Sequence, residues 1–216
     1  VFAGFDRGFK AGGFNTVRHN LFDPTGESTI TPDDFDSEFS DNSEVGIKGY
    51  FFNRSLLWNA SIFHQEYDDY QVEIQEEGTI GTVLQNAAQV VVEGFETELH
   101  WQVNTRLMVD ANIAYVDARW DDYDTAGCTR PQYEAIACDP VTGYQALSDK
   151  RVNFTNPWTA NINTTWSDSF NNGMGWFMRG EVAFRDDVIF SPDLDPATQE
   201  GSYMRLNASF GLMIDT

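Results

Sequence analysis

The chain has 216 residues, and its 34 acidic and 13 basic side chains give it a formal net charge of −21 at pH 7. Binding to nucleic-acid phosphates depends on clustered Lys and Arg, so this charge excludes most nucleic-acid-binding proteins. The length is sufficient for a hydrophobic core that needs no stabilising metal or disulfide, and no apolar run is long enough for a transmembrane helix.

Alternating apolar and polar residues are the main pattern along the chain, and a period of two places successive side chains on opposite faces of a strand. The N-terminal stretch also reads as strand. The pattern predicts an all-β, antiparallel chain of about eight strands with no long helix. The alternating runs, in chain order, are 45–51, 57–63, 95–103, 107–115, 158–166, 176–184 and 204–214.

The apolar faces of these strands favour contact with lipid over contact with a protein core. The strands run for about ten residues, the length that a transmembrane strand needs. Their apolar faces carry no Asp, Glu, Lys or Arg, and from Trp158 to Trp166 they rise roughly 20 Å, close to the ~25 Å apolar band of membrane barrels. Aromatic rings, which prefer the membrane interface, end the faces at Trp101, Tyr115, Trp158, Trp166 and Trp176.

Short and long connections alternate along the chain. Tight turns are expected at 53–55, 104–106 and 168–172, and long polar segments at 10–42, 71–84, 118–152 and 186–202. An up-and-down membrane barrel has this asymmetry, whereas a soluble sandwich has no reason to place all its long loops at one end. We therefore predict an antiparallel up-and-down transmembrane β-barrel.

Glu93, Glu96 and Glu98 with His100 form the most enzyme-like cluster, since paired carboxylates can serve acid–base hydrolysis. The polar, water-filled side of a barrel is the simpler interpretation, because Glu, His and Gln are ordinary there. We therefore expect no enzyme activity, no cofactor and no metal site. The glycine-rich stretch 9–15 lacks the GK[ST] ending of a phosphate-binding loop.

Cys128 and Cys138 are the two cysteines of the chain, and both lie in the long segment 118–152. No His lies near them and no second pair completes a tetrahedral metal site. In an exported loop, a disulfide that closes a small ring is the expected state. Two reactive thiols are the alternative.

Several short motifs together resemble the TonB-dependent outer-membrane receptor family. Each motif is weak, but their order and spacing agree with that family over nearly the whole chain. The matching stretches are Asp6-Arg7-Gly8-Phe9-Lys10-Ala11-Gly12-Gly13-Phe14-Asn15, then Glu44-Val45-Gly46-Ile47-Lys48 with Phe51-Phe52, then Asn59, Phe63, Tyr67, Asp69 and Gln71, then Asn86-Ala87, and then Gly94-Phe95-Glu96-Thr97-Glu98.

The resemblance implies a 22-stranded barrel in the bacterial outer membrane, with an N-terminal plug on which the TonB complex acts. We expect residues 1–216 to be an internal piece of that barrel domain, without the plug and the terminal strands. The implied cargo is a ferric siderophore, with glycan, haem or cobalamin as alternatives in the same family. Arg18, His19 and Tyr123 are the loop residues that we predict to contact cargo, since ferric siderophores are often anionic or aromatic.

Two other architectures are compatible with the same pattern. A complete eight-stranded outer-membrane barrel would act as an adhesin or a structural anchor. A secreted β-sandwich that binds carbohydrate would be soluble without detergent, and it would bury Trp158, Trp166 and Trp176 in protein.

Overall fold

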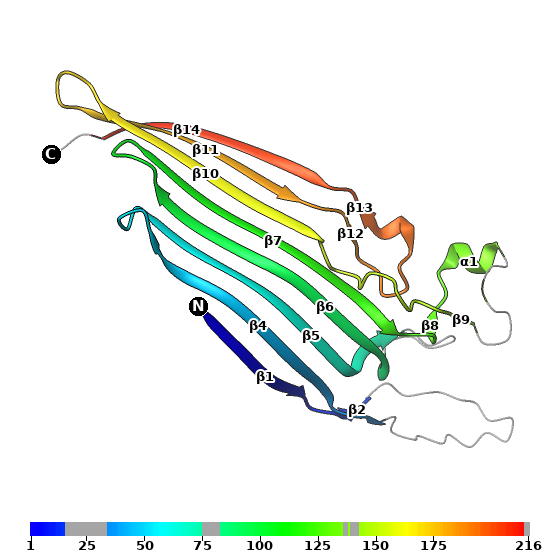
Figure 1. Ribbon diagram of the computed structural model, residues 1–216. Helices are drawn as coiled ribbons and strands as arrows, with labels where there is room; N and C mark the ends of the chain where they lie inside the picture. Colours follow the sequence, from blue (N-terminus) through cyan, green and yellow to red (C-terminus); the bar gives the residue numbers. More distant parts are fainter. Residues whose placement is uncertain (16–33, 75–82, 136–137, 139–142, 214–216) are drawn as a thin grey trace, which may run out of the picture.

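The computed structural model describes residues 1–15, 34–74, 83–135, 138 and 143–213. Within these residues the chain forms one curved antiparallel sheet of eight strands, in which each strand pairs with the next in the order β1-β4-β5-β6-β7-β10-β11-β14 (Figure 1). The strands are β1 (Phe2–Lys10), β4 (Glu38–Phe51), β5 (Leu56–Ile74), β6 (Val83–Gln102), β7 (Leu107–Asp122), β10 (Trp158–Ser169), β11 (Gly175–Arg185) and β14 (Tyr203–Met213).

The prediction of an all-β, antiparallel up-and-down sheet with about eight strands is confirmed by this arrangement. The three tight turns lie together at one end of the sheet, at the upper left of Figure 1, and the long segments lie at the other. Phe52, Asn53 and Arg54 all have positive φ in the β4–β5 turn, which lets the chain reverse within a few residues. We call these two ends the turn end and the loop end.

Short elements occupy the long segments at the loop end. They are the paired strands β2 (Gly13–Phe14) and β3 (Asp34–Phe35), β8 (Ala126–Gly127) and β9 (Tyr144–Gln145), and β12 (Val188–Ile189) and β13 (Gln199–Glu200), with the helix α1 (Arg130–Glu134) and the 3₁₀ turn η1 (Pro196–Thr198). Among the described residues, no helix has the length and apolar character needed to cross a membrane.

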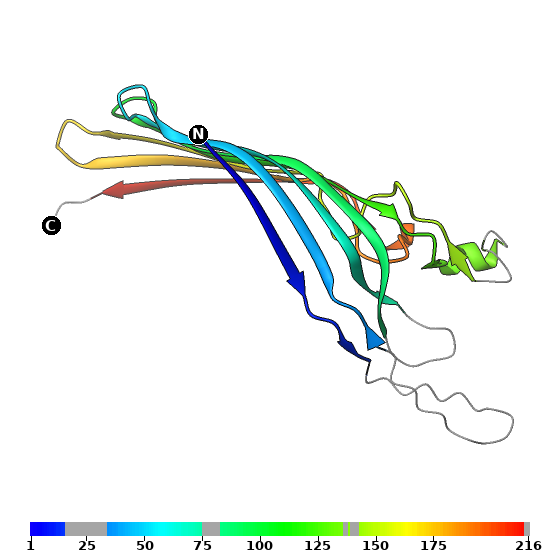
Figure 2. The ribbon, with the colours of Figure 1, turned by 60° about the horizontal axis from the view of Figure 1, so that its bottom comes forward.

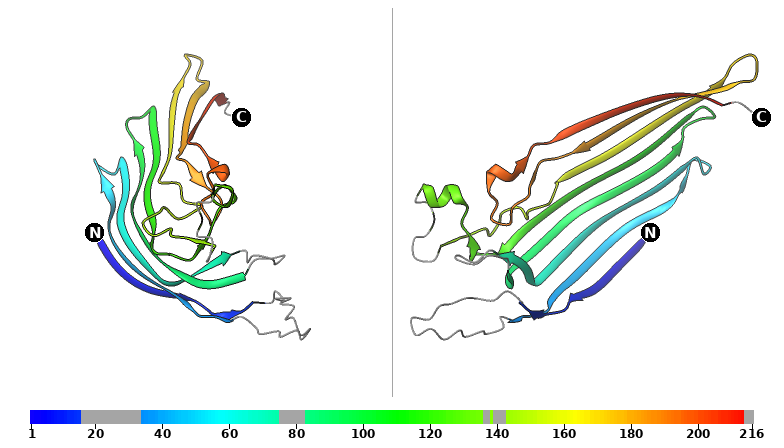
Figure 3. Two further views of the ribbon diagram at one scale, coloured as in Figure 1. Left: turned by 90° about the vertical axis from the view of Figure 1, so that its right-hand side faces the viewer. Right: turned by 180° about the vertical axis from the view of Figure 1, so that it is seen from behind.

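The sheet is strongly curved, as the end-on view in Figure 3 shows, so that it has a convex and a concave face. The strand register places apolar residues side by side in five successive rows on the convex face. Many of their large side chains are exposed, for example 63% for Ile62 and 69% for Leu206, and most of the others are half-buried. The row nearest the loop end is Val45, Ile62, Phe95, Tyr115 and Trp158, and the next is Ile47, Ala60, Thr97, Ile113, Ala160, Phe184 and Met204.

The other three rows continue toward the turn end and, like the first two, contain no Asp, Glu, Lys or Arg. At two residues per row, the five rows rise about 20 Å along tilted strands, close to the ~25 Å apolar band of membrane barrels. These rows are Gly49, Trp58, Leu99, Ala111, Ile162, Val182 and Leu206, then Phe51, Leu56, Trp101, Val109, Thr164, Gly180 and Ala208, and then Leu107, Trp166, Met178 and Phe210.

The convex face changes from apolar to charged immediately beyond the row of Phe95 and Tyr115. The next row toward the loop end runs Phe5, Ser43, His64, Glu93 and Asp117, and the row after it runs Arg7, Asp41, Glu66, Val91 and Arg119. Arg7 pairs with Asp41 and Arg119 with Asp117 in this region, at nitrogen–oxygen distances of 3.5 and 2.9 Å. Charged side chains therefore begin in the first row on the loop-end side of the apolar band.

The strands β5 and β6 are 19 and 20 residues long, and so extend well beyond the alternating runs from which they were predicted. Beyond the apolar band, polar and apolar residues are mixed along these strands, so the period-two pattern disappears although the strand pairing continues. The segment predicted as a loop over 71–84 is therefore shorter in the structure, between Ile74 and Val83.

Candidate functional site

The concave face carries polar and charged side chains over the same height at which the convex face is apolar. One row runs across seven strands as Lys48, Asn59, Glu98, Asn112, Asn161, Ala183 and Arg205. Within it, Nδ2 of Asn59 donates to Oε2 of Glu98 at 3.1 Å. This row and its neighbours line a groove of about 830 Å³ along the concave face.

The enzyme-like cluster predicted from sequence is divided between the two faces. Glu96, Glu98 and His100 lie on the concave face, where His100 Nδ1 is hydrogen-bonded to Asp110 Oδ1. Glu93 lies on the convex face, where its Oε1 is 2.9 Å from Nδ1 of His64. Within the described part of the chain, no group of three or more His, Cys, Asp and Glu side chains is arranged to hold a metal ion.

At the loop end of the concave face, the strands and two long segments enclose a small hydrophobic core, which we call the rim core. It consists of Val72, Ala88, Val90, Trp120, Tyr123, Ala126 and Leu147, all at most 7% exposed. The ring centroids of Trp120 lie 4.8 Å from Tyr123 and 5.6 Å from Tyr70. Packing at this density fixes the path of the chain as it leaves β7.

Tyr123, a predicted cargo contact, is an anchor of the rim core. Its side chain is 2% exposed, and burial raises the pKa of its phenol to about 12. Its described contacts are therefore with protein, and its contact with cargo stays a prediction. Arg18 and His19, the other two predicted cargo contacts, lie outside the described residues.

The segment between β7 and β10 is attached to the segment between β11 and β14 by several contacts. Phe154 N–H donates to the Ile189 carbonyl at 2.8 Å, and the rings of Phe154 and Phe190 meet edge to face at 5.8 Å. Arg151 and Asp187 form an ion pair, and the hydrogen bond from the guanidinium holds the pKa of Asp187 below its usual value. These two segments therefore form one body at the loop end, visible at the right of Figure 2.

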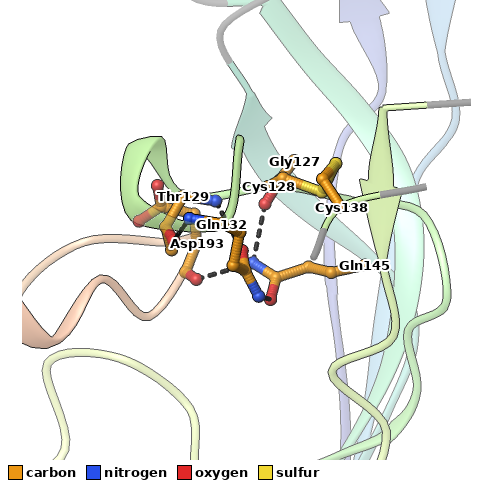
Figure 4. Close-up of a disulfide and its surroundings, with 7 residues drawn as sticks. All are labelled: Gly127, Cys128, Thr129, Gln132, Cys138, Gln145 and Asp193. Carbon is orange, nitrogen blue, oxygen red and sulfur yellow. Dashed lines mark hydrogen bonds between the residues drawn. A yellow bond between two sulfur atoms is a disulfide. The ribbon is translucent and has the colours of Figure 1, made fainter. Parts of the chain in front are cut away.

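Figure 4 shows the disulfide that joins Cys128 and Cys138 within this body. Beside it, Nε2 of Gln145 donates to the carbonyls of Gly127 and Asp193, both at 2.7 Å. Oε1 of Gln145 in turn accepts from Nε2 of Gln132 at 2.8 Å. The disulfide therefore closes the β8–β9 region, and the Gln145 amide joins that region to the β11–β14 segment. The sequence predicted the disulfide, but it carried no signal for these amide contacts.

This sheet, with lipid-like apolar rows outside, polar rows inside, tight turns at one end and long segments at the other, is the wall of a transmembrane β-barrel. The family model "TonB dependent receptor-like, beta-barrel" matches residues 1–213, so the chain belongs to the TonB-dependent receptor β-barrel family. Members of this family are outer-membrane transport receptors. No curated protein matches the chain.

Several solved structures share this fold. The ferric yersiniabactin uptake receptor FyuA from Yersinia pestis is 19% identical, with a TM-score of 0.66 over 97% of this chain and 26% of the receptor. The siderophore receptor PiuA from Acinetobacter baumannii is 16% identical, with a TM-score of 0.60 over 96% and 27%. The copper transporter OprC is 12% identical, with a TM-score of 0.59 over 96% and 28%. The chain thus spans about a quarter of the length of these structures.

Proposed function

We propose that this chain forms part of the wall and external mouth of a TonB-dependent importer in the bacterial outer membrane. The apolar rows on the convex face carry this proposal, because no second sheet covers them among the described residues, whereas the polar rows lie on the concave face as in a membrane barrel. The turn end then faces the periplasm and the loop end faces the outside. The wall supplies a sealed frame, and no bond is made or broken, so the protein is a transporter and not an enzyme.

Residues 1–216 form one part of a barrel domain of the 22-stranded type in this proposal. The plug and the remaining strands belong to other parts of the protein, and the TonB complex does work on the plug. Outer-membrane lipid covers the convex face. The chain's match to a family model confined to the barrel supports this division.

The favoured cargo is a ferric siderophore, because two of the similar structures are a ferric yersiniabactin receptor and a siderophore receptor. Arg18, His19 and Tyr123 remain the residues that we propose for cargo contact. OprC shares the same fold and is a copper transporter, so similarity in fold does not select the cargo by itself.

The cargo is tested by growing the source strain with and without an iron chelator and measuring the receptor in purified outer membranes. Strong induction by the chelator, together with loss of ⁵⁵Fe-siderophore uptake on deletion of the gene, is the expected result. If the chelator leaves receptor abundance unchanged and deletion of the gene leaves iron uptake unchanged, the iron proposal is wrong. Glycan or cobalamin then becomes the favoured cargo. Recovery of the protein in the soluble fraction would contradict the membrane assignment itself.

A further inference from the structure

Three of the sequence motifs, separated by up to about seventy residues along the chain, meet at one place on the rim of the sheet. They contribute Asn15, Gln71 and Asn86, which we call the amide cluster. Gln71 and Asn86 are direct partners across β5 and β6. The ends of the segment between β1 and β4, where β2 pairs with β3, lie against them (Figure 1).

Gln71 is the buried member of the amide cluster, at 5% exposure. Its Nε2 donates to the carbonyl of Ala11 at 3.1 Å and to that of Asp36 at 3.0 Å, so one amide binds both ends of the β1–β4 segment. Its backbone N–H donates to Oε2 of Glu38 at 2.9 Å, at the start of β4. A buried amide with this many partners fixes the segments that it joins.

Asn86 contacts the same segment from β6. Its Nδ2 donates to the Asp36 carbonyl at 3.0 Å, and its Oδ1 accepts from the Asp36 N–H at 2.6 Å. Nδ2 also donates to the carbonyl of Asp69 at 2.7 Å. Asp69 has φ of 55° and lies in an irregularity of the β5–β6 register, so its carbonyl is turned out of the ordinary ladder. Asn86 therefore binds a backbone group that the strand pairing leaves exposed.

Asn15 completes the cluster by pairing with Leu84 as a strand residue would. Its Nδ2 donates to the Leu84 carbonyl at 2.7 Å, and its Oδ1 accepts from the Leu84 N–H at 2.8 Å. Close packing accompanies these bonds, since a Cβ on Gly12 would lie 2.4 Å from the carbonyl oxygen of Phe35. The glycine and asparagine of the first motif are thus both explained by this junction.

We propose that Gln71 and Asn86 are positioning residues that hold both ends of the β1–β4 segment to the β5–β6 hairpin as one unit at the external rim. The side-chain amides continue the pairing of the sheet where the register irregularity interrupts its backbone ladder. The consequence for uptake rests on the proposed function, because the rim is the place where cargo would enter. The unit itself is defined by the hydrogen bonds above and needs no cargo.

The proposal is tested in the full-length receptor with Asn86→Ala and Gln71→Ala, and with Gln89→Ala as the matched control. Gln89 is exposed in the same part of β6. Hydrogen exchange of the Asp36 amide, which donates to Asn86, is the first readout. Asn86→Ala removes the bond that this amide donates and the two bonds that Asn86 Nδ2 donates, so it should speed the exchange at least about tenfold, whereas Gln89→Ala should leave it unchanged.

The second readout is uptake of the ⁵⁵Fe-labelled siderophore fraction from the strain's own spent medium. A positioning role predicts a several-fold higher half-saturating concentration, with the maximal rate per receptor retained. Unchanged exchange of the Asp36 amide in Asn86→Ala would show that the amide cluster does not hold the β1–β4 segment to the β5–β6 hairpin. A loss of receptor abundance with no shift in the half-saturating concentration would overturn the positioning role. If wild-type cells take up no ⁵⁵Fe, the proposal of a ferric siderophore as cargo is wrong. The exchange of the Asp36 amide still decides whether the amide cluster holds the β1–β4 segment to the β5–β6 hairpin.

Discussion

Gly94 shows how a single residue in a family motif is required by its neighbours across the sheet. A Cβ at this position would lie 2.3 Å from the carbonyl oxygen of Tyr115 and 2.6 Å from the ring of Phe63. The carbonyl belongs to the backbone of β7 and cannot move without disturbing the strand pairing. Phe63 thus packs over Gly94, which links two of the motifs that defined the resemblance.

Gly94→Ala is therefore expected to destabilise the barrel by about 1–3 kcal/mol, the usual cost of forcing a methyl group into a packed site. Gly180→Ala is the matched control, since a Cβ there would meet no atom within 4 Å among the described residues. The fraction of receptor that remains folded on unheated SDS gels, over a temperature series, measures the difference. Equal midpoints for the two variants would contradict this packing account.

The phenol of Tyr123 should remain protonated at a pH where exposed tyrosines ionise. Burial raises its folded pKa to about 12, while an unfolded chain would have the ordinary value near 10. Its contribution to stability is therefore fully present below about pH 10 and is lost as the pH rises toward 12. Ultraviolet titration of wild type against Tyr123→Phe should show no difference until the pH passes about 11. A difference near pH 10 would show an exposed phenol.

At the level of elements, the sequence predicted the strands within the apolar band and missed much of what lies beyond it. Alternation located β7, β10 and β11 because one face of each is apolar and the other is polar. It could not locate the loop-end extensions of β5 and β6, where polar and apolar residues no longer alternate. Nor could it find the rim core, because Trp120 and Leu147 come together only through the tertiary fold.

The candidate site was predictable to a similar extent. Two cysteines in one exported segment are sufficient to suggest a disulfide, so Cys128 and Cys138 could be paired from sequence alone. The motifs identified Gln71 and Asn86 as family residues but carried no indication of their partners. The partners of these side-chain amides are backbone carbonyls and one backbone N–H, 17 to 60 residues away, and backbone groups leave no trace in a residue pattern.

The disulfide should stabilise its own segment without affecting the sheet. Closing a ring between residues ten apart contributes about 3 kcal/mol by the loop-entropy account. In the double variant Cys128→Ser, Cys138→Ser, we expect faster hydrogen exchange in residues 126–135 and unchanged exchange in β7 and β10. Chemical reduction of the wild type serves as the control and should reproduce the same pattern. Faster exchange throughout the strands would contradict a local role.

The contact between Arg151 and Asp187 should depend on pH in a defined direction. The guanidinium lowers the pKa of Asp187, so the stabilisation is present above the ordinary Asp pKa and is lost as the pH falls through the lowered value. Exchange of the Phe154 amide, which donates to Ile189, reports on this contact. The ratio of its rate in Arg151→Gln to that in wild type should be above one at pH 7 and pH 5, and should approach one near pH 2. A ratio of one at pH 7 would show that the pair does not stabilise the contact.

At the scale of the whole molecule, the two faces of one sheet have opposite chemistry. Five apolar rows cover the convex face, and polar rows with a groove of about 830 Å³ cover the concave face. A soluble sandwich would bury the apolar rows against a second sheet, and the described residues place no such layer there (Figure 3). We therefore propose that lipid covers the convex face.

Quenching of tryptophan emission by brominated lipid, in the full-length receptor reconstituted into vesicles, shows whether the convex face contacts lipid. Trp166 lies on the convex face at 40% exposure, and Trp120 lies in the rim core at 2%. We predict that Trp166→Phe removes a strongly quenched part of the emission, and that Trp120→Phe removes emission that the brominated lipid does not quench. If brominated lipid does not quench the emission of Trp166, the convex face does not contact lipid, and the soluble β-sandwich becomes the better interpretation.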